Sequence, residues 1–120
     1  MYSEPLTIER YESDIAGQGV LLLKGPLVTE NLSPFQNAVR GEDAETMIID
    51  LTHVPYIDSA GLGSLVSTYV SCEKAGRRVV LAGPNKRVRR LFEITKVEPL
   101  FLIFPSLASA IETLNRAGQA

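Results

Sequence analysis

The sequence of 120 residues has few of the side chains that usually build catalytic and metal sites. It contains one cysteine, Cys72, one histidine, His53, and no tryptophan. A single cysteine excludes an intramolecular disulfide and a cysteine-based metal cluster, and a single histidine excludes a site built from several histidines. A bound metal would depend mainly on carboxylates. We therefore expect neither a metal nor another cofactor.

Long apolar segments are also missing. No run approaches the ~20 residues that a membrane-spanning helix needs. The N-terminal segment Met1-Tyr2-Ser3-Glu4-Pro5 lacks the basic and then apolar pattern of a signal peptide. We therefore expect a cytoplasmic protein without a membrane span. The length and the hydrophobic content of 45% suit one compact domain over residues 1–120.

Charge is unevenly distributed along the chain, although the net charge is only −2. Residues 1–60 hold 10 acids and 3 bases, whereas residues 61–120 hold 4 acids and 9 bases. The basic set Lys86, Arg87, Arg89 and Arg90 would suit an acidic protein partner, although a solvated helix face is the simpler interpretation. A pI near 5.4 argues against direct binding of nucleic acid.

Hydrophobic patterning predicts alternating strands and helices. Strand segments lie near 6–12, 20–23, 46–51, 79–82 and 100–104, and helical segments near 29–41, 59–76, 85–92 and 105–118. The continuous apolarity of Met47 to Leu51 is typical of a strand covered on both faces. The order ββαβαβαβα predicts an α/β domain with a mostly parallel sheet, one antiparallel edge strand and helices packed on the sheet.

The stretch from Tyr56 to Ser64 joins the most apolar strand segment to the longest predicted helix. Ligands and chemistry collect at the carboxyl ends of strands in such sheets, which is where Ser59 lies. Asp58 or Ser59 would serve as a helix cap, which is the simplest interpretation of local sequence. The same position favours negative charge, so Ser59 would also suit a phosphate. Gly61 and Gly63 would permit close packing, against the protein itself or a partner.

A serine nucleophile is the catalytic alternative for this stretch. Ser59 would then act with His53 as base and Asp50 or Asp58 as its orienting carboxylate. The G-x-S-x-G pattern is absent, because Ile57 stands two residues before the serine, and His53 precedes the serine instead of following it. No nucleotide-binding fingerprint is present either. We therefore expect that the protein is not an enzyme, and that Cys72 is a packed thiol.

Three separated segments carry a resemblance to a known family. They are Ile48 to Gly63, with its Asp58-Ser59-Ala60-Gly61-Leu62-Gly63 motif, then Val79 to Gly83, and Val88 to Thr95. Over nearly its whole length the chain resembles the STAS domain, specifically the bacterial anti-sigma factor antagonists. The resemblance implies a single STAS domain in which Ser59 is phosphorylated. It also implies a partner-binding surface, formed by Asp58, Ser59, Ala60, Gly61, Leu62 and Gly63.

The family resemblance implies a partner-switching function. An unphosphorylated antagonist of this kind binds an anti-sigma factor that is also a serine kinase, which releases a sigma factor; phosphorylation ends the binding, and a serine phosphatase restores it. One segment departs from the family pattern. Val28 in Gly25-Pro26-Leu27-Val28 replaces an aspartate that assists recognition by the kinase. The alternative function is therefore a STAS adaptor of a transporter or signalling complex that is not phosphorylated.

Overall fold

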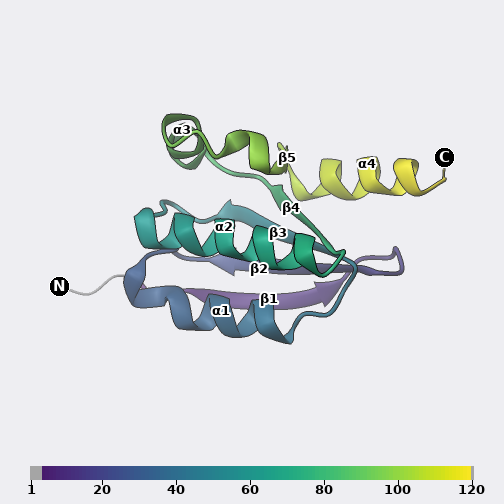
Figure 1. Cartoon of the computed structure of the whole chain (residues 1–120), viewed down its shortest axis with the longest axis horizontal. Coiled ribbons are helices and arrows are strands. Elements are labelled where there is room, and N and C mark those ends of the chain that lie inside the picture. Colours follow the sequence, from purple (N-terminus) through teal and green to yellow (C-terminus); the bar gives the residue numbers. More distant parts are fainter. Residues whose placement is uncertain (1–3, 120) are drawn as a thin grey trace.

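The computed structural model describes residues 4–119 as one five-stranded sheet with helices on both faces (Figure 1). The elements are β1 (Thr7–Glu12), β2 (Gln18–Lys24), η1 (Thr29–Asn31), α1 (Leu32–Gly41), β3 (Thr46–His53), α2 (Ser59–Lys74), β4 (Arg78–Ala82), α3 (Lys86–Ile94), η2 (Glu98–Leu100), β5 (Leu102–Phe104) and α4 (Leu107–Gln119). The predicted ββαβαβαβα order is confirmed, with two short 3-10 helices in addition. Met1 to Ser3, on which the signal-peptide interpretation partly rests, lie outside the described residues.

The strands lie in the order β1-β2-β3-β4-β5. β1 is antiparallel to β2, and every other pair is parallel, so the predicted antiparallel edge strand is confirmed. The carboxyl ends of β2, β3 and β4 therefore meet at one edge of the sheet. The loops that follow these three strands are brought together there, although they are far apart in the sequence.

The two faces of the sheet have separate cores. On one face, α1, α2 and α3 cover the side chains of residues such as Met47, Ile49 and Leu51. On the other face, α4 covers Val20, Ile48 and Val80. Because successive side chains of a strand point to opposite faces, a strand covered on both faces carries consecutive apolar residues, as β3 does at Met47, Ile48 and Ile49.

Two predicted boundaries are wrong. The last strand begins at Leu102 and not at Leu100, because Glu98–Leu100 form η2, which has Pro99 in its first turn. α4 continues to Gln119, one residue past Gly118, at which the predicted helical segment ends. A glycine inside a helix costs only about 1 kcal/mol relative to alanine, which is too little to end a helix by itself.

An ion pair between the partly exposed Arg10 and the buried Glu42 lies at the opposite, amino-terminal edge of the sheet. Arg10 donates to the Glu42 carboxylate from Nε at 2.8 Å and from Nη2 at 3.1 Å, and the Ala44 N–H donates to it at 2.9 Å. The Glu42 side chain is fully buried, whereas that of Arg10 is 42% exposed. The hydrogen bond from Arg10 is the largest of the effects that lower the Glu42 pKa.

Candidate functional site

Backbone contacts join the three loops at the carboxyl edge of the sheet. The Leu27 N–H donates to the Tyr56 carbonyl at 3.2 Å, and the Asp58 N–H donates to the Leu27 carbonyl at 3.2 Å. From the third loop, the Asn85 side-chain amide donates to the Pro55 carbonyl at 3.1 Å, and Arg87 lies over the Tyr56 ring at 5.0 Å. The segment before α2 is thus bound by the loop after β2 on one side and by the loop after β4 on the other.

Asp58 is the cap of α2 and also the link to the neighbouring loop. Its Oδ1 accepts from the Gly61 N–H at 2.8 Å, while its Oδ2 accepts from the Thr29 N–H at 3.0 Å and the Thr29 hydroxyl at 3.1 Å. Burial acts to raise the Asp58 pKa, but hydrogen bonds from Gly61, Thr29 and Ala60 outweigh it and hold the pKa below its usual value. The carboxylate is therefore charged at neutral pH, and both of its oxygens accept hydrogen bonds.

Ser59 is the first residue of α2, and its side chain is exposed. The sequence left open whether Asp58 or Ser59 caps the helix, and the structure assigns that role to Asp58. Within residues 4–119, the Ser59 hydroxyl makes no hydrogen bond or ion pair. The hydroxyl is therefore available, beside a helix start that favours added negative charge.

The two glycines after Ser59 have different surroundings. A Cβ on Gly61 would collide with the Leu27 carbonyl oxygen and lie 2.9 Å from the Leu27 carbonyl carbon, so the fold itself requires a glycine there. A Cβ on Gly63 would meet nothing within 4 Å. Gly61 and Leu62 are buried, whereas Gly63 is exposed. The surface beside Ser59 is therefore formed by Ala60 and Gly63, with Gly61 and Leu62 beneath it.

Thr29 is the site residue that sequence reasoning missed. In the sequence it is only the first residue of the helical segment predicted near 29–41, yet it donates to Asp58 through both its N–H and its hydroxyl. Val28, where the resemblance noted in the sequence leads us to expect an aspartate, is 4% exposed. The loop thus carries a buried apolar side chain at this position, and the next residue, Thr29, is hydrogen-bonded to Asp58. Thr29 and Asp58 are 29 positions apart in the sequence, and no local sequence pattern predicts a contact over that separation.

The serine-nucleophile alternative finds no support in these contacts. Asp50 is buried, and its Oδ1 accepts from the N–H and the hydroxyl of Thr52. Among the described residues, no hydrogen bond joins His53 to Ser59 or to either aspartate. The hydroxyl therefore has no base beside it and no orienting carboxylate behind that base.

The basic set on α3 lies mainly on an exposed face. Asn85 caps this helix, because its side-chain oxygen accepts from the Val88 N–H at 2.8 Å. Val88 and Phe92 are buried, and the four basic residues Lys86, Arg87, Arg89 and Arg90 are exposed. Arg87 is the member of the set tied to the site, because it lies over Tyr56.

Stability is expected to fall in acid because the two perturbed carboxyls, Asp58 and Glu42, have lowered pKa values. Both groups bind protons more readily in the unfolded chain than in the folded one. Their stabilisation is therefore complete above the ordinary values of 3.8 and 4.5, and is lost as the pH falls through the lowered values of the folded state. Urea unfolding at a series of pH values between about 3 and 7 measures this loss.

An Asp58→Asn variant removes the charge, and its side-chain oxygen can still cap the helix by accepting from the Gly61 N–H. Its NH2 group cannot accept from the Thr29 N–H, so stability should also fall by an amount that does not depend on pH. Its free energy of unfolding should depend less steeply on pH below about 5 than that of the unaltered chain. Glu42→Gln should reduce the slope separately, because the two groups lie at opposite edges of the sheet. An unchanged slope in both variants would contradict the assignment of the acid sensitivity.

Sequence and structure comparisons identify the family. The model of the STAS domain matches residues 7–110. An anti-sigma-B factor antagonist of Listeria monocytogenes is 37% identical over 78 residues, which are 65% of this chain and 65% of that protein, so the match spans just under two thirds of that relative. An anti-sigma-B factor antagonist of Staphylococcus aureus is 30% identical over 75% of this chain and 79% of that protein.

A solved structure agrees with these relatives. An anti-sigma factor antagonist from Mycobacterium paratuberculosis has a TM-score of 0.81 over 92% of this chain and 94% of that chain, at 21% identity, which shows the same fold. Within residues 4–119, every helix is too short or too polar to cross a membrane. The chain therefore belongs to the STAS domain family, and it is related in sequence to anti-sigma factor antagonists.

Proposed function

We propose that this protein is an anti-sigma factor antagonist that is switched off by phosphorylation of Ser59. The unphosphorylated form binds an anti-sigma factor, which is also a serine kinase, and thereby releases a sigma factor. The kinase transfers the γ-phosphoryl group of its ATP to the Ser59 hydroxyl, releasing ADP and the hydroxyl proton. A serine phosphatase hydrolyses the phosphoserine and restores binding. The names of the relatives support the binding function.

One observation carries the proposal for Ser59: its hydroxyl is exposed and unbonded within the described residues, because Asp58 caps α2 in its place. A serine that capped the helix would have to give up a structural hydrogen bond on phosphorylation. Ser59 gives up none. A phosphate of about −1.5 to −2 charges at a helix N-terminus is also stabilised by the helix dipole, so the fold tolerates the modified state.

The neighbourhood of Ser59 explains why the modification would end binding. Ala60 and Gly63 add little side-chain bulk, so a partner backbone could lie flat against the start of α2. Asp58 already supplies a negative charge there, and its oxygens are occupied by Gly61 and Thr29. A phosphate trapped in such an interface without a cationic partner costs several kcal/mol.

A phosphorylation assay tests the proposal directly. The chain is incubated with ATP and with its anti-sigma factor kinase, identified as the kinase that a Ser59→Ala chain retains in a pull-down, and phosphopeptides are mapped by mass spectrometry. We expect one phosphate, at Ser59. Ser59→Ala should abolish the labelling, whereas the matched variant Ser71→Ala, on an exposed serine near the other end of α2, should be labelled as before. Labelling of another residue, or none, would contradict the switch.

Val28 favours a second candidate function, that of a STAS adaptor that binds a partner without being phosphorylated. The side chain is buried and apolar, so this loop presents no carboxylate to a kinase at the family position. The same assay separates the two functions. A partner that binds the chain tightly while Ser59 stays unmodified in cells and in the assay would favour the adaptor.

A further inference from the structure

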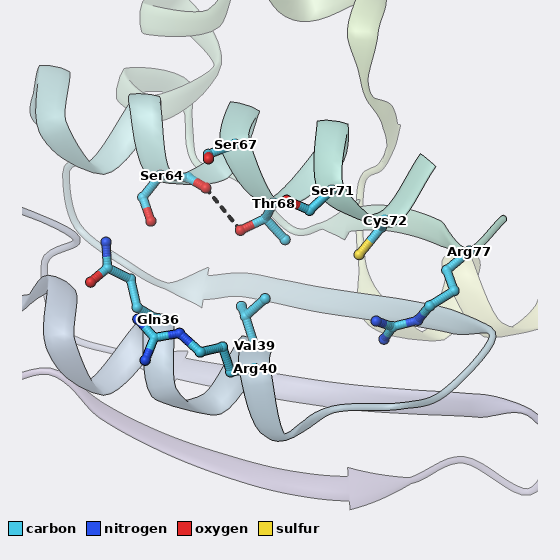
Figure 2. Close-up of a pocket in the computed structure, with 9 residues that line it drawn as sticks. All are labelled: Gln36, Val39, Arg40, Ser64, Ser67, Thr68, Ser71, Cys72 and Arg77. Atoms are coloured by element: carbon cyan, nitrogen blue, oxygen red, sulfur yellow. Dashed lines mark hydrogen bonds between the residues drawn. The ribbon is translucent and has the colours of Figure 1, made fainter. Parts of the chain in front are cut away.

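A polar groove runs between α1 and α2, away from the loops around Ser59. It has a volume of about 340 Å³, and Figure 2 shows the nine residues that line it: Gln36, Val39, Arg40, Ser64, Ser67, Thr68, Ser71, Cys72 and Arg77. None of these residues is acidic, and two carry a guanidinium. This size falls at the lower end of the range of small-molecule sites.

One end of the groove presents three groups able to donate hydrogen bonds. Ser64 is only 8% exposed, and its hydroxyl points from α2 into the groove toward the α1 wall, where Gln36 and Arg40 lie (Figure 2). Gln36 and Arg40 are four residues apart and therefore share one face of α1. Within residues 4–119, none of these three side chains has a hydrogen-bond or ion-pair partner.

The remaining polar groups along the groove are partly committed to the fold. The Thr68 hydroxyl donates to the Ser64 carbonyl at 2.8 Å. Arg77, at the other end, donates to the carbonyls of Ala44 and Glu42 at 2.9 and 2.8 Å, which holds its guanidinium in place. Thr68 and Arg77 are thus hydrogen-bonded within the fold, whereas the side chains of Ser64, Gln36 and Arg40 make no hydrogen bond within the described residues. Among the described residues, no buried side-chain oxygen or nitrogen lacks a partner, so the unbonded Ser64 hydroxyl is reached by solvent, and Gln36 and Arg40 are exposed. All three donors are therefore open to a ligand from solution.

We propose that this groove binds a small organic or inorganic oxyanion, a carboxylate or a phosphate, at the end formed by Ser64, Gln36 and Arg40. The Arg40 guanidinium offers two parallel N–H donors that match two oxygens of such a group. The Ser64 hydroxyl and the Gln36 amide donate from the two walls. This site lies on the flank of α2 and takes a free ligand, so it is independent of the phosphate acceptor at Ser59.

Titration of the isotopically labelled chain, followed by amide NMR shifts, tests the site. The probes are sodium succinate and sodium phosphate, each against sodium chloride at the same ionic strength. We expect saturable shifts with millimolar affinity at the amides around Gln36, Arg40 and Ser64. Saturation with either probe supports the site, and the tighter probe identifies the acid group. Shifts that do not saturate, or that chloride reproduces, would overturn it.

Variants separate the groove from general charge effects. Arg40→Gln should weaken binding by about tenfold, whereas Arg89→Gln, which removes an exposed charge on α3, should leave it unchanged. Ser67→Leu places an apolar side chain in the groove from an exposed position and should abolish binding without unfolding the chain. Ser59→Ala should bind normally. If Arg40→Gln and Ser67→Leu both bound the probe as tightly as the unaltered chain, the proposal would be refuted. This holds whatever the phosphorylation assay shows for Ser59.

Discussion

A Ser59→Asp variant is expected to bind the anti-sigma factor about 100-fold more weakly than the unaltered chain, which corresponds to a loss of about 3 kcal/mol. The variant places a carboxylate where the phosphate would stand, next to the Asp58 carboxylate, whose oxygens already accept three hydrogen bonds. An ionised carboxylate has no hydrogen-bond donor, so Asp58 cannot pair with the new charge and repels it instead. Ser59→Ala, which adds no charge, should keep nearly full affinity.

The same substitution should not weaken the fold. Ser59 is exposed at the first position of α2, and a negative charge there interacts favourably with the helix dipole by about 0.3–1 kcal/mol. Ser59→Asp should therefore unfold at an equal or slightly higher urea concentration. Binding that falls while stability holds identifies a surface effect, whereas a parallel loss of both would point to damage of the helix start.

Isothermal titration of each variant with the purified anti-sigma factor measures the affinity. Ser71→Asp is the matched control, because Ser71 is an exposed serine on the same helix, twelve residues further on and about 18 Å away along its axis. It should bind like the unaltered chain. If Ser59→Asp kept full affinity, or Ser71→Asp lost as much, phosphorylation of Ser59 would not be the switch.

The alternation of strands and helices was predictable because each segment has a strong period. β3 has consecutive apolar residues from Met47 to Ile49, which is typical of a strand covered on both faces, and α3 has basic residues between Val88 and Phe92. The weaker predictions concern short segments, in which a few local contacts decide the structure. Leu100 has the apolar neighbours of a strand residue, yet the chain forms a 3-10 turn there, with Pro99 in that turn.

The location of the site was predictable from the sequence, but the hydrogen bonds between its loops were not. The position of Ser59 after a buried strand follows from the order of elements. The link from Thr29 to Asp58 depends on which strand neighbours β3, and local sequence does not encode that choice. The groove escaped notice for a related reason. Ser64 and Thr68 are buried but polar, so a search for apolar faces assigns them to the surface.

Gly61→Ala is expected to destabilise the fold by about 2–3 kcal/mol, although alanine is the better helix former. The added methyl group would meet the Leu27 carbonyl, whose oxygen also accepts the Asp58 N–H. Relief of the collision requires the loop after β2 to separate from α2. The hydrogen bonds from Thr29 to Asp58 span the same gap and would lengthen with it.

Gly63→Ala is the matched control, since it adds the same methyl group to the same helix in open space. It should raise the free energy of unfolding by about 0.5–1 kcal/mol through helix propensity alone. Urea unfolding of the two variants therefore gives shifts of opposite sign. Equal shifts would show that the contact between Gly61 and Leu27 does not limit the position of α2, and that Asp58 and Thr29 hold the helix start without it.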